Sequence, residues 1–80
     1  MTLEEFRASR QPSTIAAFVE MFGGERPNSK AVTSYCQKGG YTLYILETDL
    51  GFEWMWAGPG VRWEQTLAEA EKQLWLETFA

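Results

Sequence analysis

The stretch YTLYILETDLGFEWMWAGPGVRW, residues 41–63, concentrates the aromatic and β-branched residues of this 80-residue chain. It contains three of the four tryptophans and two of the three tyrosines. On so small a scaffold, a run of this kind forms either the hydrophobic core or a contact surface, because large aromatic side chains dominate both. We expect this stretch to supply both.

Length and composition limit the chain to a single domain over residues 1–80. With 45% hydrophobic residues, it lies near the lower size at which one core is self-sufficient. Cys36 is the only cysteine, so no internal disulfide can form, and a reducing cytoplasm is the expected compartment. The N-terminus MTLEEFRASR lacks the apolar segment of an export signal, and no apolar run approaches the ~20 residues that span a bilayer.

The net charge of −4 is divided unevenly between the two halves of the chain. Residues 1–40 carry five basic and four acidic side chains, whereas residues 41–80 carry two basic and seven acidic side chains. The acidic, aromatic half would repel nucleic acid, whose binding requires clustered lysine and arginine, and would attract a basic protein surface. Alternatively, these carboxylates only keep an apolar domain in solution.

Two helices are predicted in a helical part that covers residues 1–22. Thr2 and Glu5 have the spacing of a capping box, in which each side chain accepts a hydrogen bond from the other residue's backbone amide. This spacing predicts a short first helix over residues 3–9.

The second predicted helix begins after a break at Pro12. Ser13 can serve as its N-cap, and apolar residues then recur at helical spacing until Gly23 ends the pattern. The turn-forming residues that follow, GGERPNSK, predict a loop over residues 23–30.

From residue 31 the pattern changes to strands and predicts a sheet over residues 31–57. The runs AVTSYCQ and YTLYILET are separated by a Gly-Gly pair that tolerates the positive φ of a hairpin turn. The run FEWMWA follows a second turn at residues 49–51 and ends at the Gly-Pro-Gly of residues 58–60. Three antiparallel strands in meander order are the simplest arrangement.

A C-terminal helix over residues 66–79 completes the predicted fold. Thr66 and Glu69 repeat the capping-box spacing, and an apolar stripe follows to the end of the chain. The helix is expected to pack across the sheet. The predicted class is α+β, a three-stranded antiparallel meander with two N-terminal helices and one C-terminal helix.

The register of the second hairpin decides which aromatic residues are buried. A three-residue loop would place Glu47 opposite Glu53, which like-charge repulsion disfavours, so a loop over residues 48–51 is preferred. That register pairs Ile45 with Trp54. The helix-facing core then consists of Leu43, Ile45, Phe52, Trp54 and Trp56.

The same register leaves a second apolar stripe on the other face of the sheet. Tyr44, Leu46 and Met55 are predicted there, with Tyr35 beside them. Three helices are not expected to cover both faces. The stripe is therefore either a docking face or homodimer seam, or it is covered by the short N-terminal helix or the loop.

Side chains suited to catalysis or metal binding are scarce in this sequence. The chain has no histidine, and Cys36 alone cannot hold zinc; in mid-strand it is expected to be a small buried hydrophobe. The glycine turns lack the lysine and the strand-to-helix context of phosphate-binding loops. No pair of carboxylates is placed for general acid/base work. We therefore expect a protein that is not an enzyme and that has no cofactor or metal.

Residues 41–74 resemble the core of HicB-type antitoxins, with YTLYILE as first strand, a second strand ending at Gly-Pro-Gly, and a capped helix opening TLAEA. The resemblance implies a hairpin-plus-helix fold that binds and silences a partner. In size, acidity and aromatic density the chain is also similar to phage-encoded anti-defence inhibitors such as anti-CRISPR proteins. That likeness implies carboxylates set against the basic groove of a nucleic-acid-handling complex. The two chain ends resemble those of small uncharacterised bacterial proteins, which implies no function.

These patterns together favour a stoichiometric inhibitor that occupies a basic surface on a nucleic-acid-processing partner. Aromatic residues would anchor the contact and carboxylates would steer it, with no direct binding to nucleic acid or membrane. The alternatives are a small self-associating assembly protein, which would form a homodimer, and a HicB-like antitoxin. The predicted partner-binding residues are Tyr35, Tyr44, Glu47, Glu53, Met55, Glu64, Glu69, Glu71 and Trp75.

Overall fold

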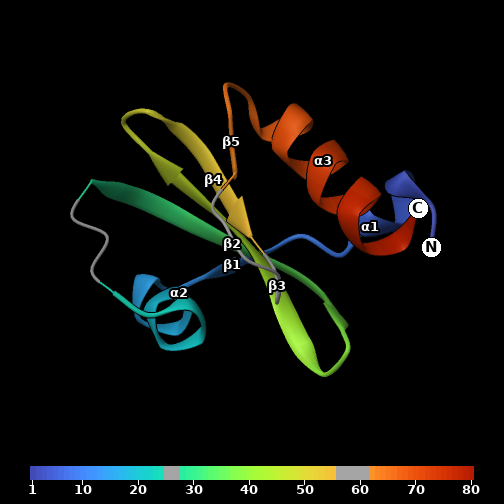
Figure 1. The fold of residues 1–80 in the computed structure, drawn as a ribbon, viewed down its shortest axis with the longest axis horizontal. Helices are drawn as coiled ribbons and strands as arrows, with labels where there is room; N and C mark the ends of the chain where they lie inside the picture. Colours follow the sequence, from blue (N-terminus) through green and yellow to red (C-terminus); the bar gives the residue numbers. More distant parts are fainter. Residues whose placement is uncertain (25–27, 56–61) are drawn as a thin grey trace.

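The computed structural model of the protein describes residues 1–24, 28–55 and 62–80. Within these residues, three helices accompany a five-stranded antiparallel sheet whose strands lie in sequence order (Figure 1). The predicted α+β class is confirmed. None of the described helices is long and apolar enough to cross a membrane. The elements are α1 (Leu3–Ala8), β1 (Gln11–Ser13), α2 (Ile15–Phe22), β2 (Ser29–Lys38), β3 (Tyr41–Thr48), β4 (Gly51–Met55), β5 (Arg62–Glu64) and α3 (Leu67–Phe79).

The predicted three-stranded meander forms the middle of this sheet, and the prediction missed both edge strands. Strand β1 pairs with β2, and β5 pairs with β4. Each edge strand has only three residues, which is too short to show the alternation by which strands are recognised in a sequence. Pro12 also argues against a central strand, although proline is tolerated at a sheet edge, where β1 lies.

The predicted helix caps are present at both ends of the chain. The Thr2 hydroxyl accepts from the backbone amide of Glu5, whose carboxylate accepts from the Thr2 amide in return, so the capping box at α1 is complete. Thr66 caps α3. The start of α2 differs by one residue, because Ser13 is paired in β1 and Thr14 takes the capping position instead.

The β3–β4 hairpin has the predicted register, with Ile45 opposite Trp54. This pair lies in the core beneath α1 and α3, and Phe52 packs against that core as expected. Trp56 and the predicted strand end at residues 58–60 lie outside the described residues. The buried members of the cluster are Phe6, Tyr35, Leu43, Ile45, Trp54, Ala70 and Leu74.

Tyr35 lies on the opposite face of the sheet from the one predicted. Gln37 pairs with Thr42 near the hairpin turn, and that register, if continued, would set Tyr35 opposite Tyr44. A register shift between Ser34 and Gln37 intervenes, so Ser34 takes the place opposite Tyr44. Tyr35 therefore points into the helix-facing core, where it is only 5% exposed.

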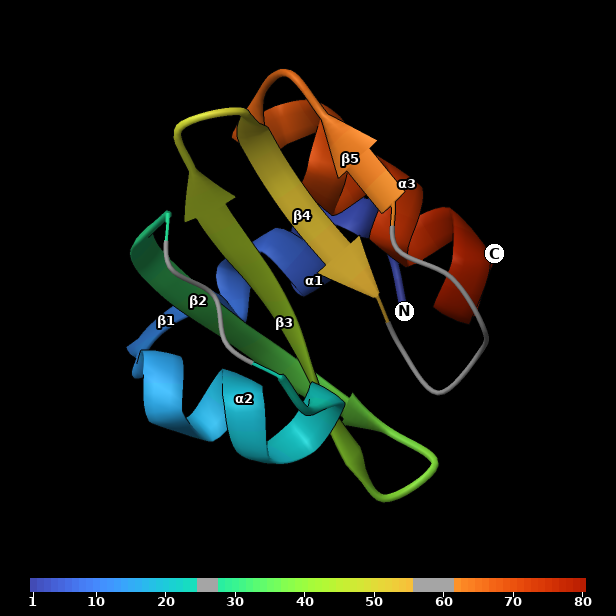
Figure 2. The same ribbon diagram turned by 60° about the vertical axis from the view of Figure 1, so that its left-hand side comes forward.

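Helix α2 covers the sheet face that lies opposite α1 and α3 (Figure 2). Phe18 is fully buried in a cluster with Val32, Tyr44 and Leu46. The rings of Phe18 and Phe22 both meet the Tyr44 ring edge-on, with centroids 6.1 Å apart. The expectation that three helices leave this face open is therefore wrong. The covering element is the second helix rather than the short first helix.

Alanine in place of Gly51 is predicted to destabilise the protein more than alanine in place of Gly39. Gly51 has a φ of 136°, and a Cβ there would lie 2.7 Å from the backbone oxygen of Glu64 on β5. Gly39 has a φ of 60° and open space around it. Gly39→Ala should lower the free energy of unfolding by about 1–2 kcal/mol through backbone strain, and Gly51→Ala by roughly 1 kcal/mol more. Urea unfolding measures both changes, and equal costs would contradict the close approach of β5 to the hairpin.

Candidate protein-binding surface

The nine residues predicted to bind a partner do not share one environment. Their side chains range from fully buried to exposed. The buried ones cannot contact a partner in this structure. Tyr35, Tyr44, Glu53 and Glu71 are buried, Glu47, Met55, Glu64 and Trp75 are half-buried, and Glu69 is exposed.

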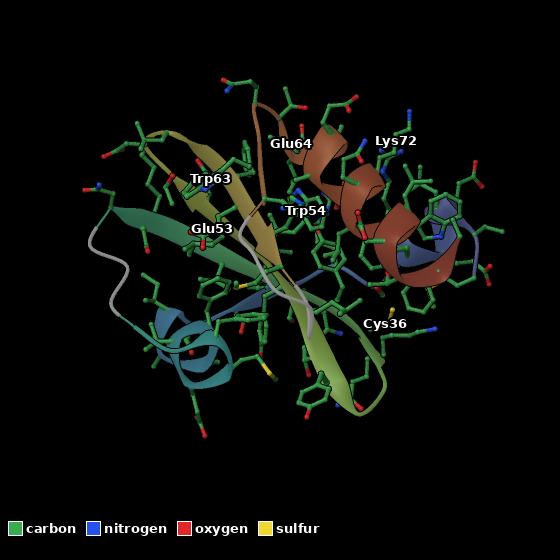
Figure 3. All side chains as sticks on the ribbon, viewed as in Figure 1. Cys36, Glu53, Trp54, Trp63, Glu64 and Lys72 are labelled. Carbon is green, nitrogen blue, oxygen red and sulfur yellow. The ribbon has the colours of Figure 1, made fainter. Side chains whose placement is uncertain are left out.

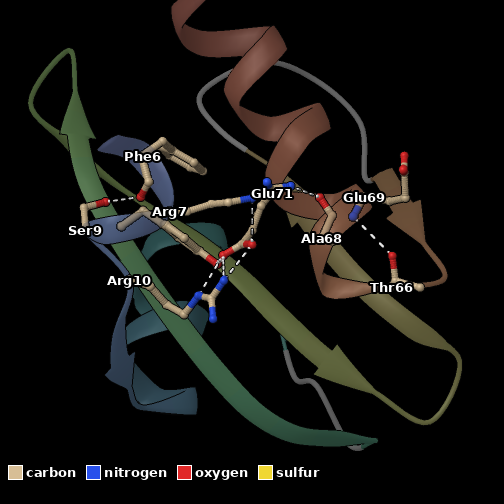
Figure 4. A network of polar contacts seen from close by, with 9 residues as sticks. Phe6, Arg7, Ser9, Arg10, Thr66, Ala68, Glu69 and Glu71 are labelled. Atoms are coloured by element: carbon tan, nitrogen blue, oxygen red, sulfur yellow. Dashed lines mark hydrogen bonds and ion pairs between the residues drawn. The ribbon is translucent and has the colours of Figure 1, made fainter. Parts of the chain in front are cut away.

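Glu71 is the centre of a buried polar network between α3 and the N-terminal part of the chain (Figure 4). Its carboxylate is 1% exposed and accepts two hydrogen bonds of 2.8 Å from the Arg10 guanidinium, one to each oxygen. The Tyr35 hydroxyl donates a third bond of 2.5 Å. Bidentate, charge-assisted bonds of this kind are among the strongest in proteins. The carboxylate is therefore fully engaged inside the fold.

Arg7 adds a second cation to this network. Its Nε lies 3.4 Å from a carboxylate oxygen of Glu71, and its Nη2 donates to the Ala68 carbonyl at 3.1 Å. The Phe6 ring stacks on Tyr35 with centroids 4.6 Å apart. Helix α1 is thereby joined to both α3 and β2 by polar and aromatic contacts. Glu71, predicted to steer a partner, instead holds the fold together.

Burial and hydrogen bonding shift the protonation equilibria of this network. Burial, followed by the hydrogen bond to Glu71, raises the pKa of Tyr35. The hydrogen bond to Glu71 is also the main cause that raises the pKa of Arg10. Both shifts favour the neutral tyrosine and the charged arginine over a wide pH range.

Other buried or half-buried candidates also lie within the fold or pack against its core. Tyr44 lies beneath α2, and Glu53, only 3% exposed, sits on β4 between Leu46 and Trp63 of the neighbouring strands. Trp75 packs against the core, and its indole nitrogen donates to the Met1 carbonyl at 2.9 Å.

Among the nine predicted partner-binding residues, three acidic side chains reach the surface without an ion pair to a described residue, namely Glu47, Glu64 and Glu69. Asp49 differs from them, because it lies 3.2 Å from the ammonium group of Lys30. Figure 3 shows Glu64 close to the point where β5 leads into α3. Together with Glu77, near the end of α3, these three residues are the exposed or half-buried acidic side chains of this half that form no described ion pair.

An exposed aromatic residue that sequence reasoning did not select lies next to Glu64 in the chain, on the other face of β5. Trp63, on the edge strand β5, is 44% exposed, and Figure 3 shows it beside Glu53. Leu50, in the β3–β4 turn, is 73% exposed. The available signal for Trp63 was its position between two charged residues, Arg62 and Glu64, outside any long alternating run.

No group of three or more histidine, cysteine or acidic side chains in residues 1–24, 28–55 and 62–80 could hold a metal ion. Cys36 is half-buried rather than fully buried as predicted, and its amide donates to the Ser9 hydroxyl at 3.2 Å. Comparison of the chain with protein-family models, curated proteins and solved structures finds no match. The arrangement of surface residues is therefore the basis for any functional proposal.

Glu71→Gln should destabilise the protein far more than Glu69→Gln, because the Glu71 carboxylate is buried and pairs with two arginines, whereas Glu69 is exposed. Removing one partner of a fully buried ion pair costs about 3–5 kcal/mol; here roughly 2–3 kcal/mol is expected because both arginines are partly exposed. Glu69→Gln should change the free energy of unfolding by less than about 1 kcal/mol. Chemical denaturation of both variants checks this, and similar values would show that the network contributes little.

Stability should fall in alkali because of Tyr35. The pKa of Tyr35 is raised in the folded state above its ordinary value of 10.0, so the unfolded chain loses this proton first. The resulting stabilisation is complete below pH 10 and decreases above it, by up to ~1.4 kcal/mol per pH unit. Tyr35→Phe lacks this titration, so the stability difference between wild type and variant should shrink as pH rises from 9 to 11.5. A difference that stays constant in urea unfolding would contradict the assignment.

Proposed function

We propose that the protein is a non-enzymatic inhibitor that acts in the cytoplasm by binding a basic surface on a nucleic-acid-processing partner. The observation that supports this proposal is the contrast between two kinds of carboxylate. Glu71 is neutralised inside the fold, whereas Glu47, Glu64 and Glu69 reach the surface with no described ion-pair partner. Their charge is available to attract and orient a basic partner.

Trp63 replaces the buried tyrosines as the proposed anchor of the contact. Tryptophan is enriched among the residues that dominate binding energy, because it buries a large area at little conformational cost. Leu50 adds an exposed apolar side chain at the neighbouring hairpin turn. Trp63 lies at the edge of the sheet, and Glu64 follows it on the other face of β5. In the general design of interfaces, desolvated residues bind and charged rim residues steer.

The class of inhibitor that this chemistry suits best is the one encoded by phages and other mobile elements against host defence complexes. Such complexes handle nucleic acid through basic grooves, and an acidic protein can compete for them. A HicB-like antitoxin is the alternative, since it would also silence a partner by direct binding. The stretch that carries this resemblance, residues 41–74, contains β3, β4, β5 and the first part of α3.

Self-association is the less favoured alternative. This alternative requires an apolar stripe that is open to a second copy of the chain. Two residues of the predicted stripe, Tyr44 and Leu46, are buried beneath α2. Met55 remains half-buried. A seam of useful area would therefore require α2 to move.

The proposal predicts that removing the surface charges weakens capture of the partner. A tagged protein carrying Glu47→Gln, Glu64→Gln and Glu69→Gln should bind about 1–3 kcal/mol more weakly than wild type, at roughly 0.2–1 kcal/mol per exposed charge. The assay is affinity capture from a lysate of the native host, elution by salt, and identification of the released protein by mass spectrometry.

A matched triple variant at other exposed glutamates, Glu4→Gln, Glu20→Gln and Glu77→Gln, controls for net charge. It should retain the nucleic-acid-handling partner that wild type captures. If both triple variants lost partner binding equally, the effect would come from the overall charge of the protein and not from these three positions. Recovery of only an untagged copy of the chain would favour self-association.

A further inference from the structure

Four residues form a row across the sheet, each directly opposite the next on neighbouring strands. Ala31 pairs with Glu47, Glu47 with Phe52, and Phe52 with Glu64. Directly paired residues point to the same side of a sheet, so the row shares one face. It is the face that α1 and α3 cover farther along, because Ile45, two residues before Glu47, lies in their core.

The row lies near one end of the sheet, close to the β3–β4 turn. It is adjacent to the pair that closes the β3–β4 turn, and Figure 1 shows this turn reaching beyond both α1 and α3. Ala31 is exposed, and Glu47, Phe52 and Glu64 are half-buried. Phe52 packs against the helix-facing core and is half-buried, so only the remaining part of its side chain is accessible, with a glutamate on each side.

The two glutamates are not occupied by partners within the described chain. Neither carboxylate forms a described ion pair, and Arg62, two residues before Glu64 on the same face of β5, makes none with it. Glu47 and Glu64 are separated by two strand spacings, about 9.5 Å. This spacing is measured between the backbones, and the flexible glutamate side chains reach into it from both sides. It suits a planar cation that lies between them and donates hydrogen bonds of about 2.7–2.9 Å.

We propose that Phe52, with Glu47 and Glu64 on its two sides, receives an arginine side chain from the basic surface of the partner. The guanidinium stacks on the ring while its donors reach the carboxylates. Lysine fits less well, because its ammonium is a compact and strongly hydrated point charge that cannot stack as a plane. This inference rests on the proposed function and names the partner chemistry that the acidic surface selects.

Fluorescently labelled hexa-arginine and hexa-lysine peptides test the preference by fluorescence anisotropy at low salt. Wild type should bind hexa-arginine about two- to fivefold more tightly than hexa-lysine, the size of an exposed cation–π contribution. Phe52→Leu, which keeps an apolar side chain, should abolish the preference, and Phe52→Tyr should restore it. The double variant Glu47→Gln, Glu64→Gln should bind both peptides more weakly than wild type. The control double variant Glu20→Gln, Glu77→Gln should keep the preference for hexa-arginine.

A folding defect in Phe52→Leu would not obscure the result, because the resonances of the Phe52 ring in the wild-type protein provide a second measurement. Hexa-arginine should shift them in NMR spectra more than hexa-lysine does. Equal binding of the two peptides, or a preference that survives Phe52→Leu, would overturn the arginine inference while the acidic-surface proposal stands. Binding of neither peptide would also overturn it, and the capture experiment would then decide the proposed function by itself.

Discussion

The buried carboxylate of Glu71 is the interaction on which the rest of the fold depends. Removing a charged group from water costs several kcal/mol unless its hydrogen-bonding capacity is satisfied. Arg10 and Tyr35 satisfy it directly, and Arg7 adds a second positive charge. These partners come from the N-terminal segment and from β2, so one carboxylate joins three parts of the chain. Helix α1, with six residues, is too short to be stable by itself and requires such contacts.

This network changes the meaning of the charge asymmetry along the chain. The first half carries a basic surplus of one and the second half an acidic surplus of five. Part of that difference is complementary, because arginines of the first half neutralise a glutamate of the second. The Lys30–Asp49 pair has the same character. The surface carboxylates that remain include Glu47, close to the β3–β4 turn, and Glu64 and Glu69, close to the start of α3. The acidic surplus thus serves both folding and the proposed binding.

Local signals in the sequence predicted much of the fold. The capping box at Thr2, the N-cap at Thr66 and the hairpin turn at Gly39 depend on neighbouring residues only, and they are present. The β3–β4 register was also predictable, because repulsion between Glu47 and Glu53 excludes the competing alignment.

The remaining features depend on contacts between residues far apart in the chain. A register shift within β2 places Tyr35 on the helix-facing side. No local sequence pattern predicts this irregularity. Glu71 meets arginines that lie about sixty residues away in sequence, so its burial could not be inferred from its own helix. Glu69 was predicted correctly as exposed, because its position on its own helix is enough to determine its exposure.

Native-state hydrogen exchange tests the central claim most directly, because it compares the stability of α1 with that of α3 in the unmodified protein. The amides of Phe6 and Ala70 form equivalent first-turn bonds of 3.0 Å, and both residues are fully buried. If the Glu71 network makes α1 part of the cooperative fold, the two amides should exchange with similar free energies and similar denaturant dependence. The account would be contradicted if the Phe6 amide exchanged through a local opening that is insensitive to denaturant and whose free energy is several kcal/mol lower than that of the Ala70 amide.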